Sequence, residues 1–123
     1  MLQGVDEVVF FVKDIEEVKR WIQNLLQCPV VFESPEYCAV LVGNTKIGLH
    51  LRDEKNSGTG SGQVAYWHVH DMEHVIKKFQ DAGCRLYRGP IRGMDGPMVC
   101  QMQDPFGNIW GFVDYSVLNP SCD

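Results

Sequence analysis

The chain has 123 residues and a formal net charge of −5, so it is the size of one domain and lacks the basic surface of a nucleic-acid-binding protein. No apolar run reaches the length of a membrane span, which argues against a membrane partner. The N-terminal segment carries Asp6 and Glu7 where a signal peptide needs basic residues, so we expect a cytoplasmic protein.

The first half of the sequence predicts one strand, one helix and three more strands. The apolar run at 8–12 has the length of a strand and predicts the first strand, and Asp14 follows at the position of a helix N-cap. The apolar residues of the predicted helix recur every three or four positions, at Ile15, Val18, Ile22 and Leu25. The remaining strands are expected at 29–34, 37–43 and 45–51, with a hairpin turn at Gly43-Asn44.

The second half repeats this order after a polar connector at 53–62. The segment V-K-D-I-E-E-V at 12–18 matches V-H-D-M-E-H-V at 69–75. Asp71 again takes the N-cap position of a helix with its own apolar stripe, and Gly83 follows as a natural C-cap. Strands are expected at 84–91, 97–103 and 108–113, and the turn D-P-F-G-N joins the last two.

Two copies of one β-α-β-β-β unit predict an α+β fold in a single domain. Each copy should form a curved mixed sheet with its helix outside, and a lone copy of about 50 residues would bury too little surface to be stable. We therefore expect the two sheets to lie around a cleft. The predicted boundaries are module one at 4–52, the connector at 53–62, module two at 63–114 and a tail at 115–123.

The cysteines are odd in number, and none of them shows C-x-x-C spacing: Cys28, Cys38, Cys84, Cys100 and Cys122. This pattern argues against both a disulfide framework and a zinc knuckle. Four of the five lie in apolar, strand-like surroundings, so we interpret them as structural thiols. A catalytic cysteine is the alternative.

This layout resembles the vicinal oxygen chelate superfamily, which contains glyoxalase I, extradiol dioxygenases, fosfomycin-resistance enzymes and bleomycin-resistance proteins. The segment D-P-F-G-N-I-W-G-F at 104–112 looks like the family's D-P-x-G-N turn and final strand. The segment E-V-V-F-F-V-K-D at 7–14 looks like its first strand and helix cap, and the resemblance covers residues 5–114. It implies a homodimer and metal ligands on the first and last strands of each module.

Mapped onto this chain, the family's metal positions are Glu7 and Val64 on the first strands, with His50 and Gly111 on the last strands. If Gly48 is the residue that matches Gly111, it still shares a face with His50, because strand side chains alternate. Val64 and Gly111 offer no side-chain ligand, whereas catalytic divalent sites generally use three. A divalent metal (Zn, Ni, Fe or Mn) would therefore need further ligands, from His68 or from a second subunit.

Strand alternation also predicts which residues line the cleft. Glu7 and His50 are the candidate catalytic pair, because a carboxylate and an imidazole that face one cavity can perform acid-base chemistry. The candidate ligand-binding residues are Phe11, Arg52, Tyr66, His68 and Gly111. Gly111 has no side chain and should leave room for a bulky ligand.

Two functions from different classes follow. The first is a binding protein similar to the bleomycin-resistance branch, which holds a small aromatic or cationic organic molecule without a complete metal site. The second is a metal-dependent lyase, isomerase or dioxygenase of the glyoxalase type, with Glu7 and His50 on the metal. Metal-free acid-base chemistry by Glu7 with His50 or His68 is a third function that the sequence leaves open.

Overall fold

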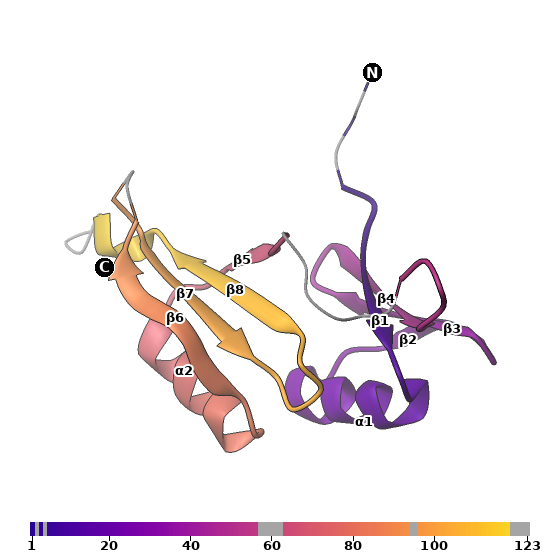
Figure 1. Cartoon of the computed structure of the whole chain (residues 1–123). Coiled ribbons are helices and arrows are strands. Elements are labelled where there is room, and N and C mark those ends of the chain that lie inside the picture. The colour runs from indigo at the N-terminus through magenta and orange to yellow at the C-terminus, as the bar shows by residue number, and fades with distance from the viewer. Residues whose placement is uncertain (2, 4, 57–62, 94–95, 119–123) are drawn as a thin grey trace. The chain divides into compact units, whose positions relative to one another are not determined.

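The computed structural model (Figure 1) describes residues 1, 3, 5–56, 63–93 and 96–118. The chain divides into two compact units, Met1–Gly60 and Ser61–Asp123, and each unit is described by itself. Module one and module two denote the described residues of the first and the second unit. None of the helices in these ranges is long and apolar enough to cross a membrane.

The elements of module one are β1 (Glu7–Val12), α1 (Ile15–Leu26), β2 (Val30–Ser34), β3 (Tyr37–Val42) and β4 (Thr45–Leu51). They form a sheet with the strand order β1-β4-β3-β2, in which β1 runs parallel to β4 and the other neighbours are antiparallel. Helix α1 packs against β3 and β4. The predicted order of elements is confirmed, and the Gly43-Asn44 turn joins β3 to β4 as expected.

The elements of module two are β5 (Tyr66–His68), α2 (Met72–Asp81), β6 (Arg85–Arg92), β7 (Met98–Gln103), β8 (Ile109–Asp114) and a 3-10 helix (Ser116–Leu118). The strand order β5-β8-β7-β6 repeats the topology of module one, again with a parallel first pair. Figure 1 shows each helix against one face of its own sheet. The α+β fold of two tandem modules is therefore confirmed.

The face of each sheet that is turned toward its helix carries the core. In module one, Ile22 of α1 is fully buried together with Ile47 and Leu49 of β4. In module two, the ring of Phe79 on α2 meets Phe112 and Trp110 of β8 at centroid distances of 4.8 and 5.6 Å. Because strand side chains alternate, the residues between these point to the opposite side, which we call the open face of each sheet.

Both helices begin at the predicted caps. The carboxylates of Asp14 and Asp71 each accept, at 3.1 Å, the backbone N–H three residues ahead. Helix α2 ends before Gly83, whose φ of 96° suits the residue after a C-cap. Helix α1 ends without a glycine, because Gln27 itself takes the left-handed conformation at φ 51° and donates to the Gln23 carbonyl at 2.8 Å.

The D-P-F-G-N turn is organised by the buried side chain of Asp104. Its carboxylate accepts the backbone N–H groups of Phe106 and Asn108, each at 2.9 Å. It also accepts the indole N–H of Trp110 at 2.9 Å. The first residue of the motif thus holds both the turn and a core side chain of β8, and so fixes the position of Gly111 on that strand.

A second buried carboxylate, Asp114, lies at the end of β8. It accepts hydrogen bonds from the Met72 backbone N–H and from both the N–H and the hydroxyl of Ser116. Burial disfavours the ionised form, but the hydrogen bonds outweigh burial and hold the pKa of Asp114 below its ordinary value. Asp114 therefore fastens the start of α2 and the 3-10 helix to the last strand.

The four cysteines within the described residues are buried and free: Cys28, Cys38, Cys84 and Cys100. Burial raises the pKa of each thiol. For Cys84, burial together with the nearby charge of Asp104 raises the pKa to about 12. These thiols stay protonated at neutral pH, as the structural interpretation requires. Cys122 lies outside the described residues.

Candidate functional site

The open face of module one carries a hydrogen bond between Glu7 of β1 and Tyr37 of β3. The Tyr37 hydroxyl donates to Oε2 of Glu7. Strand β4 lies between β1 and β3, so this contact has to cross β4. Gly48 of β4 permits the crossing, because a Cβ added there would collide with the Glu7 carboxylate and lie 2.8 Å from the Tyr37 ring. The absence of a side chain at Gly48 therefore makes the Glu7–Tyr37 contact possible.

Tyr37 is held as a neutral phenol. Burial and, after it, the hydrogen bond to Glu7 together raise its pKa from the ordinary 10 to about 12. At neutral pH the hydroxyl keeps its proton and remains a donor to the Glu7 carboxylate. The pair is therefore a fixed donor and acceptor, with the position of the acid set by the tyrosine.

His50 of β4 lies next to this pair, with its ring centroid 6.3 Å from that of Tyr37. Its Nδ1 lies 2.7 Å from the Leu51 carbonyl oxygen. A carbonyl oxygen can only accept a hydrogen bond, so Nδ1 carries the proton and the neutral ring has its lone pair on Nε2. In this tautomer Nε2 can accept a proton, accept a hydrogen bond or bind a metal.

Four rings, one from each strand, form a row across the open face of module one. In strand order they are Phe11, His50, Tyr37 and Phe32, with successive centroid distances of 5.2, 6.3 and 5.8 Å. Phe32, on the edge strand β2, is 55% exposed, and the other three are partly buried. We call these four residues the aromatic row. It places an apolar surface beside the carboxylate of Glu7.

The structure brings three of the predicted site residues together in module one, namely Glu7, His50 and Phe11. Arg52 follows β4 as an exposed residue, and its Nε donates to the Phe11 backbone carbonyl at 3.4 Å. The sequence reasoning missed Tyr37. Counting outward in pairs from the Gly43-Asn44 turn places Tyr37 opposite His50, and the strands have this register. The register of the β3–β4 hairpin could therefore have predicted that Tyr37 lies beside His50.

On the open face of module two, the side chain that lies over the glycine of the last strand is an aromatic ring and not a carboxylate. The ring of Tyr66 on β5 lies over Gly111 of β8, where a Cβ would come within 2.8 Å of the ring. The Tyr66 hydroxyl accepts a hydrogen bond from Nε2 of Gln101 on β7 at 2.6 Å. The expectation of free space above Gly111 is therefore wrong, because the aromatic side chain of the neighbouring strand occupies it.

The other predicted residue of module two, His68, is exposed on β5. Its ring lies beside that of Tyr115, with a centroid distance of 5.5 Å. The β5–β8 register pairs Tyr66 with Gly111, and His68 follows two residues later on the same face. A ligand-binding role for these three residues stays a prediction, as does the cleft.

The described residues do not supply a complete set of metal ligands. Among them, no three His, Cys, Asp or Glu side chains lie close enough together to hold one ion. Module one offers Glu7 and His50, whereas the matched positions in module two are Val64 and Gly111, which have no donor. Catalytic divalent sites generally use three protein ligands. The residues present therefore do not fit a metal centre of the family type.

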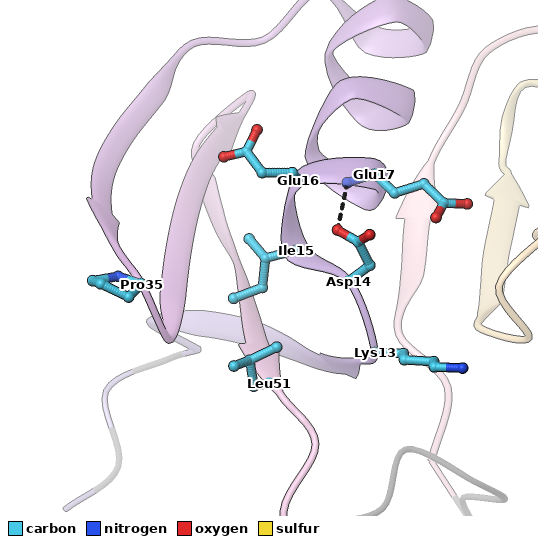
Figure 2. A pocket seen from close by; sticks show the side chains of 7 residues that line it. All are labelled: Lys13, Asp14, Ile15, Glu16, Glu17, Pro35 and Leu51. Carbon is cyan, nitrogen blue, oxygen red and sulfur yellow. Dashed lines mark hydrogen bonds between the residues drawn. The ribbon is translucent and has the colours of Figure 1, made fainter.

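A separate hollow of about 570 Å³ lies at the N-terminal end of α1, and none of the aromatic-row residues line it. Figure 2 shows the Asp14 carboxylate within it turned toward the backbone N–H of Glu17, with Pro35 and Leu51 on the opposite side. Asp14 is thus already engaged as the helix cap. The hollow has a structural explanation, and the open face remains the candidate site.

Comparison with solved structures finds the same fold in several proteins. The fosfomycin resistance protein FosX from Listeria monocytogenes, in complex with Mn(II) and sulfate, has a TM-score of 0.75 at 12% identity, over 93% of this chain and 91% of that chain. A superfamily member from Sphaerobacter thermophilus has a TM-score of 0.75 at 20% identity, over 92% and 98%. A glyoxalase-related enzyme from Fulvimarina pelagi has a TM-score of 0.72 at 20% identity, over 94% and 91%.

At these identities the likeness to solved structures concerns the fold alone. None of the curated proteins matches the sequence. The family comparison is more specific, because its match runs over residues 4–112 and so includes both modules. The chain therefore belongs to the Glyoxalase/Bleomycin resistance protein/Dioxygenase superfamily.

Proposed function

We propose that this protein binds a small organic molecule on the open face of module one, without a complete metal site. The observation that carries the proposal is the Glu7–Tyr37 hydrogen bond, which crosses Gly48 beside His50. Small-molecule sites combine apolar and aromatic surface with a few fixed polar groups. The aromatic row, together with Glu7, has this composition.

A thermal-shift screen of small organic compounds tests the proposal. Binding to the native state raises the free energy of unfolding by about 2.7 kcal/mol when the free ligand is at 100 times its Kd. Compounds that raise the melting temperature of the wild type should lose most of this effect in Glu7→Gln. They should keep it in Glu36→Gln, which removes an exposed acid of the same module. Hits that respond equally to the two substitutions would contradict the proposal.

A metal-dependent lyase, isomerase or dioxygenase of the glyoxalase type is the second candidate. It is favoured by the lone pair on Nε2 of His50, which shares the open face with Glu7, and by the likeness to FosX, whose structure contains Mn(II). It requires at least one ligand beyond these two residues. Elemental analysis of protein purified without chelator distinguishes the candidates. Stoichiometric Zn, Ni, Fe or Mn that is lost in Glu7→Gln and in His50→Gln would favour the enzyme.

We also expect a homodimer, as membership of the superfamily implies. Light scattering coupled to size-exclusion chromatography measures the mass in solution directly. A mass twice that of the 14.0 kDa chain would support the dimer, and a mass equal to that of the chain would contradict it.

A further inference from the structure

We infer that the site on the open face of module one selects a cation that carries N–H donors, such as an ammonium or amidinium group on an apolar body. This inference rests on the proposed function and adds the chemical class of the ligand. It follows from three features of the face: an acid without a cationic partner, two acceptor atoms on Glu7 and His50, and adjoining rings.

Glu7 has no cationic partner within the described part of module one. Its Oε2 accepts a hydrogen bond from the neutral Tyr37 hydroxyl. Lys46, which lies opposite Glu7 in the strand register, pairs instead with Asp6 at 3.5 Å. Arg52 donates to a backbone carbonyl. A partly buried carboxylate among aromatic rings is stabilised by an incoming positive charge.

Two acceptor atoms next to the Glu7–Tyr37 hydrogen bond are left for a ligand. The Tyr37 hydrogen bond occupies Oε2 of Glu7, and Oε1 has no hydrogen-bond partner among the described residues of module one. His50 uses its Nδ1 proton on the Leu51 carbonyl, so the neutral form of the ring has its lone pair on Nε2. Two acceptors on one face are satisfied together by a ligand that donates more than one N–H. Ammonium and amidinium groups do so and also carry the required charge.

The rings next to Glu7 favour the same charge. Tyr37 holds the carboxylate through its hydroxyl, and its ring centroid lies 5.8 Å from that of Phe32. Aromatic faces attract cations through the ring quadrupole, and ring clusters are a recurring means of binding ammonium groups. Phe32 is 55% exposed, so a ligand can reach this end of the aromatic row from solvent.

Benzamidine and benzamide are matched probes for this inference, since they share a planar shape and differ in charge. Titration of ¹⁵N-labelled protein, followed by NMR, measures the affinity of each probe and the residues that it touches. We expect benzamidine to bind at least about tenfold more tightly than benzamide, because it adds a charge-assisted hydrogen bond and a cation–π contact. The amide signals of Glu7, Tyr37 and His50 should shift.

Variants then separate the contributions of charge and rings. Glu7→Gln should reduce the affinity for benzamidine to that for benzamide, while Glu36→Gln should leave it unchanged. Phe32→Leu changes an exposed residue of an edge strand, so folding is not at risk, and it should weaken benzamidine binding about threefold. The spectrum of each variant without probe checks that the fold is retained.

Equal affinity for benzamide and benzamidine at these residues would overturn the cationic class and leave the proposed function standing. A preference for benzamidine that survives Glu7→Gln would also overturn the inference, since the charge would then be recognised elsewhere. If neither probe shifts Glu7, Tyr37 or His50, the inference fails, and the proposed function is then decided by its own compound screen.

Discussion

In module one the side chain that crosses the glycine of the last strand is that of Glu7, whereas in module two it is that of Tyr66. Both crossings end in a hydrogen bond to the third strand of their module, at Tyr37 and Gln101 respectively. The backbone plan is the same in the two modules. In module one, however, a carboxylate lies beside an imidazole, and in module two a tyrosine hydroxyl accepts from an amide. A repeated fold therefore does not carry a repeated site.

The acids of module two that are buried are used for structure. Asp104 holds the turn before β8, and Asp114 holds the segments that meet at the end of β8. In module one the turn between β3 and β4 is a two-residue hairpin, and the acid after β4, Asp53, is exposed. The difference predicts that removing acids from module two affects stability, while removing Glu7 affects binding.

The largest effect is expected for Asp104→Ala. It removes a buried carboxylate, and the N–H groups that donate hydrogen bonds to it then have no partner. The free energy of unfolding should therefore fall by about 3 kcal/mol. Asn44→Ala, in the corresponding turn of module one, should change it by less than about 0.5 kcal/mol. Urea unfolding followed by tryptophan fluorescence measures both. Similar losses in the two variants would remove the contrast between the turns.

The next effect concerns Asp114 and depends on pH. Its folded-state pKa is lower than the unfolded value of about 3.9, so its contribution to stability is present above that value and is lost as the pH falls through the folded-state pKa. Asp114→Asn should cost about 2 kcal/mol at pH 7, and the difference from wild type should shrink below about pH 4. Urea unfolding at a series of pH values measures it.

Asp53→Asn is the matched control for Asp114→Asn. Asp53 follows the last strand of module one and accepts the backbone N–H groups of Lys55 and Asn56, but it is exposed. The substitution should change the free energy of unfolding by less than about 0.5 kcal/mol at any pH. A pH-independent loss in Asp114→Asn would show that packing, and not the charge, is responsible.

The smallest expected change in the free energy of unfolding comes from substituting Gly111 or Gly48, and the two should differ. In Gly111→Ala the new Cβ meets the Ala65 backbone carbonyl as well as the Tyr66 ring, each at 2.8 Å, and the cost should be about 1.5 kcal/mol. In Gly48→Ala the new Cβ meets the end of the Glu7 side chain and the Tyr37 ring but no backbone atom, so only side chains have to move. That variant should lose less than about 1 kcal/mol and should lose ligand binding, because Glu7 leaves Tyr37. A larger cost for Gly48→Ala in urea unfolding would contradict this assignment.

The fold could be predicted because its signals are local. The repeated Asp14 and Asp71 mark helix starts through a bond three residues away, and the Gly43-Asn44 turn sets the register of its own hairpin. The site was predicted only in part. Strand alternation puts Glu7 and His50 on one face, but the partner of Glu7 is two strands away, and its contact depends on how far a side chain leans over Gly48. Strand alternation predicts on which face of the sheet a side chain lies, but it does not predict which neighbouring strand that side chain contacts.

The same limit explains the error at Gly111. A glycine on the open face predicts empty space only if its neighbours stand upright, and Tyr66 leans across it to reach Gln101. The end of α1 is a further case, because Gln27 adopts a conformation that is usually associated with glycine. The residue type at position 27 does not indicate this left-handed conformation.

The central claim is that the ligand chemistry of this protein belongs to the open face of module one. The most direct test is residue-resolved NMR mapping of whichever compound raises the melting temperature most in the thermal-shift screen. The amide shifts should cluster at Phe11, Tyr37 and His50. Shifts that cluster instead at Tyr66 and Gln101, with the first group unmoved, would contradict it.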